Sequence, residues 1–168
     1  MIWSDKAIKD GQRCGKINIT PFNEGMLQPN SIDLTLDDEI LVYDRGRKEW
    51  FDDFVSDGFK LTDKYFVLAS TAEKITLGNG VCGQVDGKSS YGRKGLRIHQ
   101  TAGWIDSGFS GNITLEMDTI GEDIKLEVGM PICQLVLFDA YPSEKPYGSE
   151  GLGSHYMNQK GVTPSYIR

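Results

Sequence analysis

The chain of 168 residues is 39% hydrophobic and carries a formal net charge of −6. This length fits one ordinary domain that buries most of its apolar surface, so we expect a single domain over residues 1–168. The net negative charge argues against a broad nucleic-acid or anionic-membrane surface, because such partners need an extended basic face.

The chain shows no targeting or membrane segment. Its first residues lack an apolar core of signal-peptide length, and no run is long enough to span a bilayer, so we expect a cytoplasmic protein. Cys14, Cys82 and Cys133 are scattered and odd in number, which favours reduced thiols over a disulfide framework.

The first half of the chain predicts one helix followed by strands. Ser4 is a candidate cap for a helix over residues 5–10, with Gly11 as its stop. Residues 32–36 alternate between apolar and polar side chains, as in a half-buried strand, and residues 40–43 are expected to continue that sheet. The stretch 44–63 has no clear period, and its first residues predict an exposed turn.

The second half predicts a series of short strands. We expect them at 66–71, 74–77, 81–85, 96–99, 111–117, 124–126 and 131–138. Their spacing is typical of an all-β sandwich or barrel. From about residue 141, Pro and Gly recur too often for a regular element, which predicts an irregular arm lying across another part of the protein.

One segment is locally cationic. Residues 87–105 contain no acidic residue, although acids outnumber bases along the chain. The segment contains Lys88, Arg93, Lys94, Arg97 and His99. Such a Gly- and Ser-rich cationic stretch predicts a pocket for a compact anion such as a phosphate.

Residues 88–93 are the densest part of this segment. Ser89, Ser90 and Arg93 place two hydroxyls and a guanidinium within a short stretch, a set that could cradle a phosphate. The alternative is a surface turn in which the two serines bond their own backbone. The pattern alone leaves both interpretations open.

Two carboxylates and a histidine complete the reactive side chains. Asp106 follows an apolar pair and fits either a turn residue or a base. Glu116 alternates with apolar neighbours, so it is a candidate proton carrier if its strand face lines a pocket, and a solvated residue if that face meets water. His99 is expected to be a packed or solvent residue, and with two histidines and no paired ligand spacing no catalytic zinc is expected.

Four segments carry a resemblance to a known family. These are Q-P-N-S-I-D-L at 28–34, G-K-S-S-Y-G-R at 87–93, H-Q-T-A-G-W-I-D-S-G-F-S-G-N-I-T-L-E at 99–116 and P-Y-G-S-E-G-L-G-S-H-Y-M-N-Q-K-G at 146–161. Together they resemble the dCTP deaminase family of the trimeric dUTPase superfamily. The resemblance implies a mainly β subunit, a distorted β-barrel or jelly roll with a short N-terminal helix and an irregular C-terminal arm over about 141–168.

The resemblance also implies the assembly and the substrates. It implies a homotrimer whose active sites are shared between neighbouring subunits, and the Gly- and Pro-rich arm is expected not to pack on its own subunit. The substrates are dCTP and dUTP. Mg²⁺ is carried by the triphosphate, with no direct protein ligand.

Residue by residue, the resemblance implies the following roles. Glu116 matches the general base and acid of deamination, with Ser89 and Arg93 in the same set, and the carbonyl of Ala102 matches the group that positions the water. Asp106 matches the aspartate that holds the deoxyribose 3′-hydroxyl and helps to activate water for attack at the α-phosphate.

Further residues match substrate contacts. Tyr147 and Gln159 match arm residues that close over the phosphates and base. His155 stands where lysine is more usual, and because histidine is mostly uncharged at neutral pH it is expected to weaken one triphosphate contact. The other expected substrate contacts are Lys88, Ser90, Thr101, Gly103, Trp104 and Ile105.

The family has two branches, one that stops at dUTP and one that continues to dUMP and pyrophosphate. The segment T-A-G-W-I-D resembles the second branch, and Gly103 is expected to leave space for a hydrolytic water or a looser lid. The alternatives are a monofunctional deaminase, a catalytically silent nucleotide-binding regulator, and a carbohydrate-binding module with exposed aromatic platforms and no cationic pocket.

Overall fold

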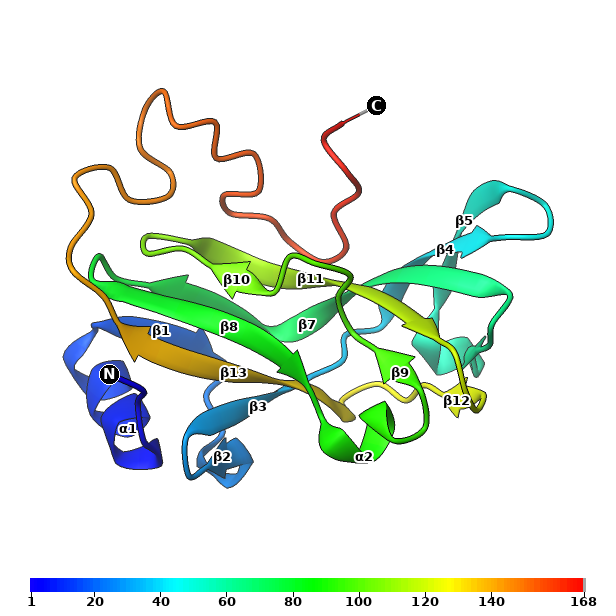
Figure 1. Ribbon diagram of the computed structural model, residues 1–168, viewed down its shortest axis with the longest axis horizontal. Helices are drawn as coiled ribbons and strands as arrows, with labels where there is room; N and C mark the ends of the chain where they lie inside the picture. Colours follow the sequence, from blue (N-terminus) through cyan, green and yellow to red (C-terminus); the bar gives the residue numbers. More distant parts are fainter. Residues whose placement is uncertain (168) are drawn as a thin grey trace.

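The computed structural model describes residues 1–167 and is built mainly of strands (Figure 1). The helices are α1 (Asp5–Cys14) and α2 (Ser89–Gly92), with short 3-10 turns η1 (Glu24–Met26) and η2 (Val55–Asp57). The strands are β1 (Ile17–Thr20), β2 (Leu27–Gln28), β3 (Ser31–Thr35), β4 (Glu39–Asp44), β5 (Glu49–Phe54), β6 (Lys60–Leu61), β7 (Tyr65–Leu77), β8 (Val81–Gly87), β9 (Leu96–Arg97), β10 (Trp104–Ile105), β11 (Ser110–Thr119), β12 (Ile124–Lys125) and β13 (Pro131–Asp139). The predicted fold class, mainly β with a short N-terminal helix, is confirmed.

The strands form two large sheets and one small one. One sheet has the order β5-β4-β7-β11-β9, with β1 also pairing with β7. The second has the order β10-β8-β13-β3-β2, and β12 pairs with β6. A single hydrophobic cluster takes side chains from both sheets and from α1, including Ile8, Leu34 and Val67. The fold therefore has one core.

The N-terminal helix is longer than predicted. Ser4 caps it as expected, because its Oγ accepts a hydrogen bond from the Ala7 amide at 3.3 Å. The helix ends at Gly15, whose φ of 76° is the left-handed conformation that glycine adopts readily. Gly11, the predicted stop, lies inside the helix, where a Cβ would approach the Trp3 ring to 2.4 Å. Gly11 is thus a packing glycine and not a terminator.

The early strands differ from the prediction in their partners. β3 is buried on both faces, and even Asp33 is only 5% exposed, so it is not the half-buried strand that alternation predicts. β4 pairs with β5 and β7 in the other sheet and does not continue the sheet of β3. The stretch without a clear period contains β5, which completes this hairpin.

β7 is one strand of thirteen residues, although two short strands are predicted. A β-bulge against β11 interrupts the regular pairing. Ser70 pairs with Thr114 on one side of the bulge, and Lys74 pairs with Asn112 on the other. The Thr71 Oγ1 atom accepts a hydrogen bond from the Ile113 amide at 3.0 Å. The Asn112 side chain donates to the Thr71 carbonyl at 2.8 Å. Polar side chains thus replace the missing ladder bonds, and pairing resumes on both sides of the bulge.

The C-terminal arm has no helix or strand over residues 140–167, as predicted, and passes over β11 (Figure 1). The Asn158 amide donates to the Ser110 carbonyl at 2.6 Å, and the Asn112 amide donates to the Gln159 carbonyl at 3.1 Å. The expectation that the arm cannot pack on its own subunit is therefore wrong. Its Gly and Pro content prevents regular structure, but its main-chain groups still bond to β11.

The three cysteines, Cys14, Cys82 and Cys133, are free thiols. Among residues 1–167, no helix combines the length and the apolar composition that crossing a membrane requires.

Candidate active site

A cavity of about 830 Å³ lies between β11, the segment 100–106 and the arm. We call it the β11 cavity. Its wall includes eight of the residues that the sequence singles out: Thr101, Ala102, Trp104, Ile105, Asp106, Glu116, Tyr147 and Gln159. Residues from four separate parts of the chain thus meet at one hollow.

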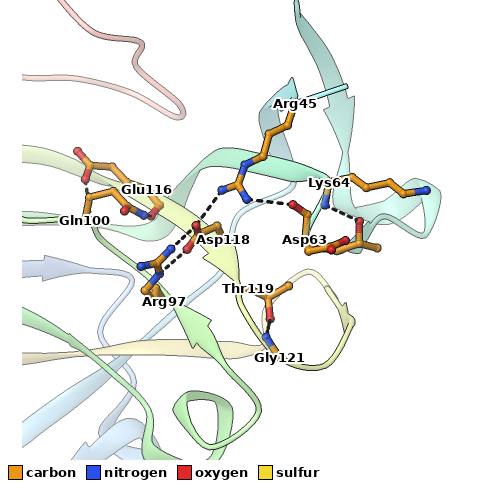
Figure 2. A network of polar contacts seen from close by, with 10 residues as sticks. Arg45, Asp63, Lys64, Arg97, Gln100, Glu116, Asp118, Thr119 and Gly121 are labelled. Carbon is orange, nitrogen blue, oxygen red and sulfur yellow. Dashed lines mark hydrogen bonds and ion pairs between the residues drawn. The ribbon is translucent and has the colours of Figure 1, made fainter. Parts of the chain in front are cut away.

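Glu116 lies in the wall of this cavity, so its strand face lines a pocket and does not simply meet water. Its Oε2 atom accepts a hydrogen bond from the Gln100 amide at 3.0 Å. Its own amide donates to the Ile98 carbonyl at 3.0 Å, and the Gln100 side chain donates to the Glu116 carbonyl at 3.2 Å. The main chain at residues 98–100 therefore sets the direction of the carboxylate (Figure 2).

Asp106 is a turn residue whose side chain also lines the cavity. Its carbonyl accepts a hydrogen bond from the Phe109 amide at 3.2 Å, which closes a turn. Its carboxylate is exposed, lines the β11 cavity and has no hydrogen-bond partner among residues 1–167. The carboxylate is therefore available to a ligand hydroxyl or a water.

Gly103 does not leave the space that is expected beside it. It is buried, and a Cβ there would lie 2.8 Å from both the His99 Nε2 atom and the Val85 carbonyl oxygen. The Val85 amide also donates to the Gly103 carbonyl at 2.7 Å. The room that glycine provides is filled by the imidazole and by β8.

This close packing makes Gly103→Ala a test of the loop's fit. The added methyl group must displace backbone or the His99 ring, so the free energy of unfolding should fall by about 1–3 kcal/mol. Gly92→Ala is the control, because a Cβ at Gly92 meets nothing within 4 Å. Urea unfolding of the two variants measures the difference. A Gly103→Ala protein as stable as Gly92→Ala would contradict this packing.

The residues at α2 lie apart from the β11 cavity. Lys88, Ser89, Ser90 and Arg93 do not line it, and α2 lies on the opposite side of the molecule from the arm (Figure 1). Ser89 and Ser90 are exposed, and their hydroxyls have no hydrogen-bond partner among residues 1–167. Within one chain, the predicted deamination set is therefore divided between two places.

The cationic segment does not form one anion pocket, because acids from elsewhere in the chain neutralise most of it. Lys88 contacts the buried Asp33 carboxylate. Lys94 lies 3.5 Å from Glu122, and Arg97 pairs with Asp118. Within the described part of the chain, Arg93 has no such ion pair. Arg93 is the cation of this segment that remains available to a ligand or a neighbouring subunit.

Asp118 lies two residues beyond Glu116 on β11 and forms ion pairs with Arg45 and Arg97 (Figure 2). Burial by itself would raise the pKa of Asp118, but hydrogen bonds from Arg97 and Arg45 outweigh burial and hold that pKa below its usual range. Because the folded pKa is lowered, the stabilisation is present above the ordinary aspartate value of about 3.9 and is lost as pH falls through the folded pKa. Asp118 is therefore ionised at neutral pH.

The arm supplies the remaining predicted residues. Tyr147 and Gln159 line the cavity, and the Gln159 side chain donates to the Asn112 carbonyl at 2.5 Å. His155 lies outside the cavity wall, where its ring stacks on Tyr166 with centroids 3.8 Å apart. The arm is thus fastened over β11, while His155 packs within the arm itself.

Sequence patterns do not identify two features of the site. Gln100, which holds Glu116 through two hydrogen bonds, lies within the segment 99–116 that carries the family resemblance, but the sequence predicts no role for it. An apolar wall comes from β4, β5 and β7: Leu41, Trp50, Phe66 and Leu68. The stretch around Trp50 shows no period, so nothing in the local pattern connects it to β11.

Comparisons with known proteins show the family to which the chain belongs. Residues 2–140 match the family model described as dCTP deaminase-like. The chain is 43% identical to a dCTP deaminase, dUMP-forming, of Acidothermus cellulolyticus, over 98% of this chain and 94% of that protein. It is 40% identical to the protein of the same name from Thermobifida fusca, over 98% and 92% of the two chains.

A solved structure shares the fold. The crystal structure of 2'-deoxycytidine 5'-triphosphate deaminase from Agrobacterium tumefaciens superposes with a TM-score of 0.69 at 20% identity. The match covers 81% of this chain and 47% of that chain, so the present chain spans about half of that protein's length.

Proposed function

Because the chain belongs to the dCTP deaminase-like family, we propose that it deaminates dCTP by hydrolysis and then converts the resulting dUTP to dUMP and pyrophosphate in the same site. The observation that carries the proposal is the β11 cavity, whose wall contains Glu116, Ala102 and Asp106 together. The relatives named dUMP-forming support the second step. Family membership also argues against a carbohydrate-binding module.

In the proposed deamination, Glu116 carries protons. It accepts one proton from a water as the water oxygen bonds to C4 of cytosine, and it passes that proton to N3. It then moves the proton of the added hydroxyl to the amino group, so the C4–N bond breaks, ammonia leaves and C4 becomes a carbonyl. The Ala102 carbonyl orients the water, which supplies position without a metal ion's acidity.

In the proposed second step, Asp106 acts at the other end of the nucleotide. Its exposed carboxylate holds the 3′-hydroxyl of deoxyribose and helps to activate a second water. That water bonds to the α-phosphorus, the bond to the bridging oxygen of the β-phosphate breaks, and pyrophosphate leaves dUMP behind. Asp106 and Glu116 therefore serve different reactions in one cavity.

Ser89 and Arg93 complete this site only if another chain supplies them. Both lie outside the cavity of their own chain, and both have side chains without partners among residues 1–167. We infer a homotrimer in which α2 of one subunit reaches the β11 cavity of its neighbour. A ring of identical head-to-tail contacts gives every cavity the same set of residues.

Magnesium enters this proposal with the substrate. Among residues 1–167, no three His, Cys, Asp or Glu side chains lie close enough to hold a metal ion. In the proposal, the oxygens of the triphosphate hold Mg²⁺, as phosphate oxygens commonly do. Such an ion neutralises triphosphate charge, while the residues of the chain position the base and the waters.

Incubating the purified protein with dCTP and magnesium tests the function. Ammonia and pyrophosphate should appear in equal amounts, with dUMP as the nucleotide product and no accumulation of dUTP. Accumulation of dUTP without pyrophosphate would make the protein a monofunctional deaminase. Binding of dCTP without release of ammonia would make it a silent regulator and overturn the proposal.

A further inference from the structure

Two arginines from separate segments close on one buried carboxylate beside the cavity (Figure 2). Asp118 is 2% exposed. The Arg97 Nε and Nη2 atoms lie 2.7 and 2.6 Å from its two carboxylate oxygens, and Arg45 Nη2 lies 2.9 Å from Oδ2. A two-point contact between a planar guanidinium and a carboxylate fixes direction as well as distance. The two hydrogen bonds from Arg97 therefore fix its side chain against Asp118 on β11.

The ion pair of Arg97 with Asp118 lies next to the main-chain groups that orient Glu116. Arg97 and Asp118 are directly opposite each other on β9 and β11, so their side chains share a face of the sheet. Glu116 is two residues from Asp118 along β11, which places both carboxylates on that face. The next residues after Arg97 supply the contacts at 98 and 100 that hold the Glu116 main chain and carboxylate.

Apart from the buried side chains of Leu96 and Ile98, few side-chain contacts hold this segment in place. β9 has only two residues, so it offers few ladder hydrogen bonds of its own. Beyond the contacts of residues 98 and 100 with Glu116, the next main-chain hydrogen bond is at the Gly103 carbonyl, which accepts from Val85 at 2.7 Å. Between these points, residues 98–102 form no strand or helix. The ion pair of Arg97 with Asp118 is the charged side-chain contact that fastens the upstream end, between the buried residues Leu96 and Ile98.

We propose that Arg97 and Asp118 are positioning residues that hold the segment 97–100 against β11 and so keep the Glu116 carboxylate aimed into the cavity. This inference rests on the proposed role of Glu116 in deamination. It assigns no role in the hydrolysis of dUTP, which depends on Asp106. A loss confined to one reaction therefore distinguishes positioning from general support of the fold.

Arg45 provides a matched control. It binds the same Asp118 carboxylate, but from the turn between β4 and β5. Its other contacts are with the Asp63 carbonyl, at 2.9 Å from Nη1, and with the Lys64 carbonyl, at 3.0 Å from its amide. Arg45 does not contact residues 97–100 by any hydrogen bond. Removing Arg45 also removes an ion pair with Asp118, a single hydrogen bond in this case, without releasing that segment.

The experiment measures kcat and KM for ammonia release from dCTP and for pyrophosphate release from dUTP. Each variant is assayed well below its unfolding temperature. Arg97→Met should lower kcat for deamination by about 10- to 100-fold, the cost expected when a reacting group is misplaced by about 1 Å. Its KM for dCTP and its dUTP hydrolysis should stay near wild type, and Arg45→Met should retain both reactions.

Three results would overturn the inference: unchanged deamination in Arg97→Met, equal losses of deamination in Arg97→Met and Arg45→Met, or equal losses of both reactions in Arg97→Met. If Arg97→Met does not fold, Arg97→Lys replaces it, because lysine keeps the charge but not the two-point contact. A several-fold fall in deamination alone then supports positioning, and unchanged deamination contradicts it. Wild-type protein that releases no ammonia would instead refute the proposed function.

Discussion

Glu116→Gln is expected to lower dCTP deamination by at least about 10²–10⁴-fold, the contribution typical of a positioned acid–base group. Glutamine keeps the shape of the side chain, and its amide oxygen can still accept the hydrogen bond from the Gln100 amide. It cannot take a proton from water. Nucleotide binding should largely survive, so ammonia release and dCTP affinity, measured on the same protein, separate chemistry from binding.

The second reaction supplies the internal control for this variant. Attack at the α-phosphorus is proposed to depend on Asp106, so Glu116→Gln should still release pyrophosphate from dUTP. Asp106→Asn should show the reverse pattern, with pyrophosphate release depressed. Glu116→Gln protein that deaminates dCTP at nearly the wild-type rate would show that Glu116 is not the proton carrier.

Mixing two inactive variants should restore deamination if the sites are shared between subunits. Arg93→Ala and Glu116→Gln each lack one component of every site. In a trimer that contains both chains, a site can combine Arg93 from one chain with Glu116 from its neighbour. Random assembly restores about a quarter of the sites, since each site needs the right chain on both sides of one head-to-tail contact.

The control for mixing combines Glu116→Gln with a chain that carries both substitutions. No chain then supplies Glu116, so activity should stay at the level of the parents. Light scattering should show three chains in every preparation. Mixed trimers without restored activity, or a monomer that still turns over dCTP at high dilution, would contradict the shared site.

Local patterns predict those parts of the fold that local chemistry decides. The cap at Ser4 depends on a hydroxyl and an amide three residues apart, and the irregular arm depends on its own Gly and Pro content. The helix end is different. Gly11 looks like a stop until Trp3 packs against it, and this contact depends on how α1 sits on the core.

Partners distant in sequence are what the patterns miss. β4 does not join the sheet of β3, because it pairs with β7, and the local sequence of β4 does not specify this partner. In the same way, the acid-free segment looks like one cationic pocket only until Asp33 and Asp118 are brought to it by β3 and β11. Ion pairs between remote residues leave no periodic signal. Within the described part of the chain, Arg93 is the one Lys or Arg of this segment without an ion pair, and only the folded chain reveals this.

In the candidate site too, the sequence predicts some residues, while others depend on how remote segments pack together. The motif residues Ala102, Asp106 and Glu116 meet in one cavity, as the family resemblance implies for a single active site. The apolar wall around Trp50 comes from a stretch without a clear period, and the two hydrogen bonds from Gln100 come from a motif residue for which the sequence predicts no role. Their contribution depends on strand order and on an irregular turn, which sequence alone does not specify.

A crystal structure of Glu116→Gln protein with dCTP and magnesium tests the central claim most directly, because slow deamination leaves the substrate in place. We predict cytosine in the β11 cavity, with C4 facing residue 116 and a water between C4 and the Ala102 carbonyl. Ser89 and Arg93 at that nucleotide should belong to the neighbouring subunit. Cytosine bound outside the cavity, or remote from residue 116, would contradict the account.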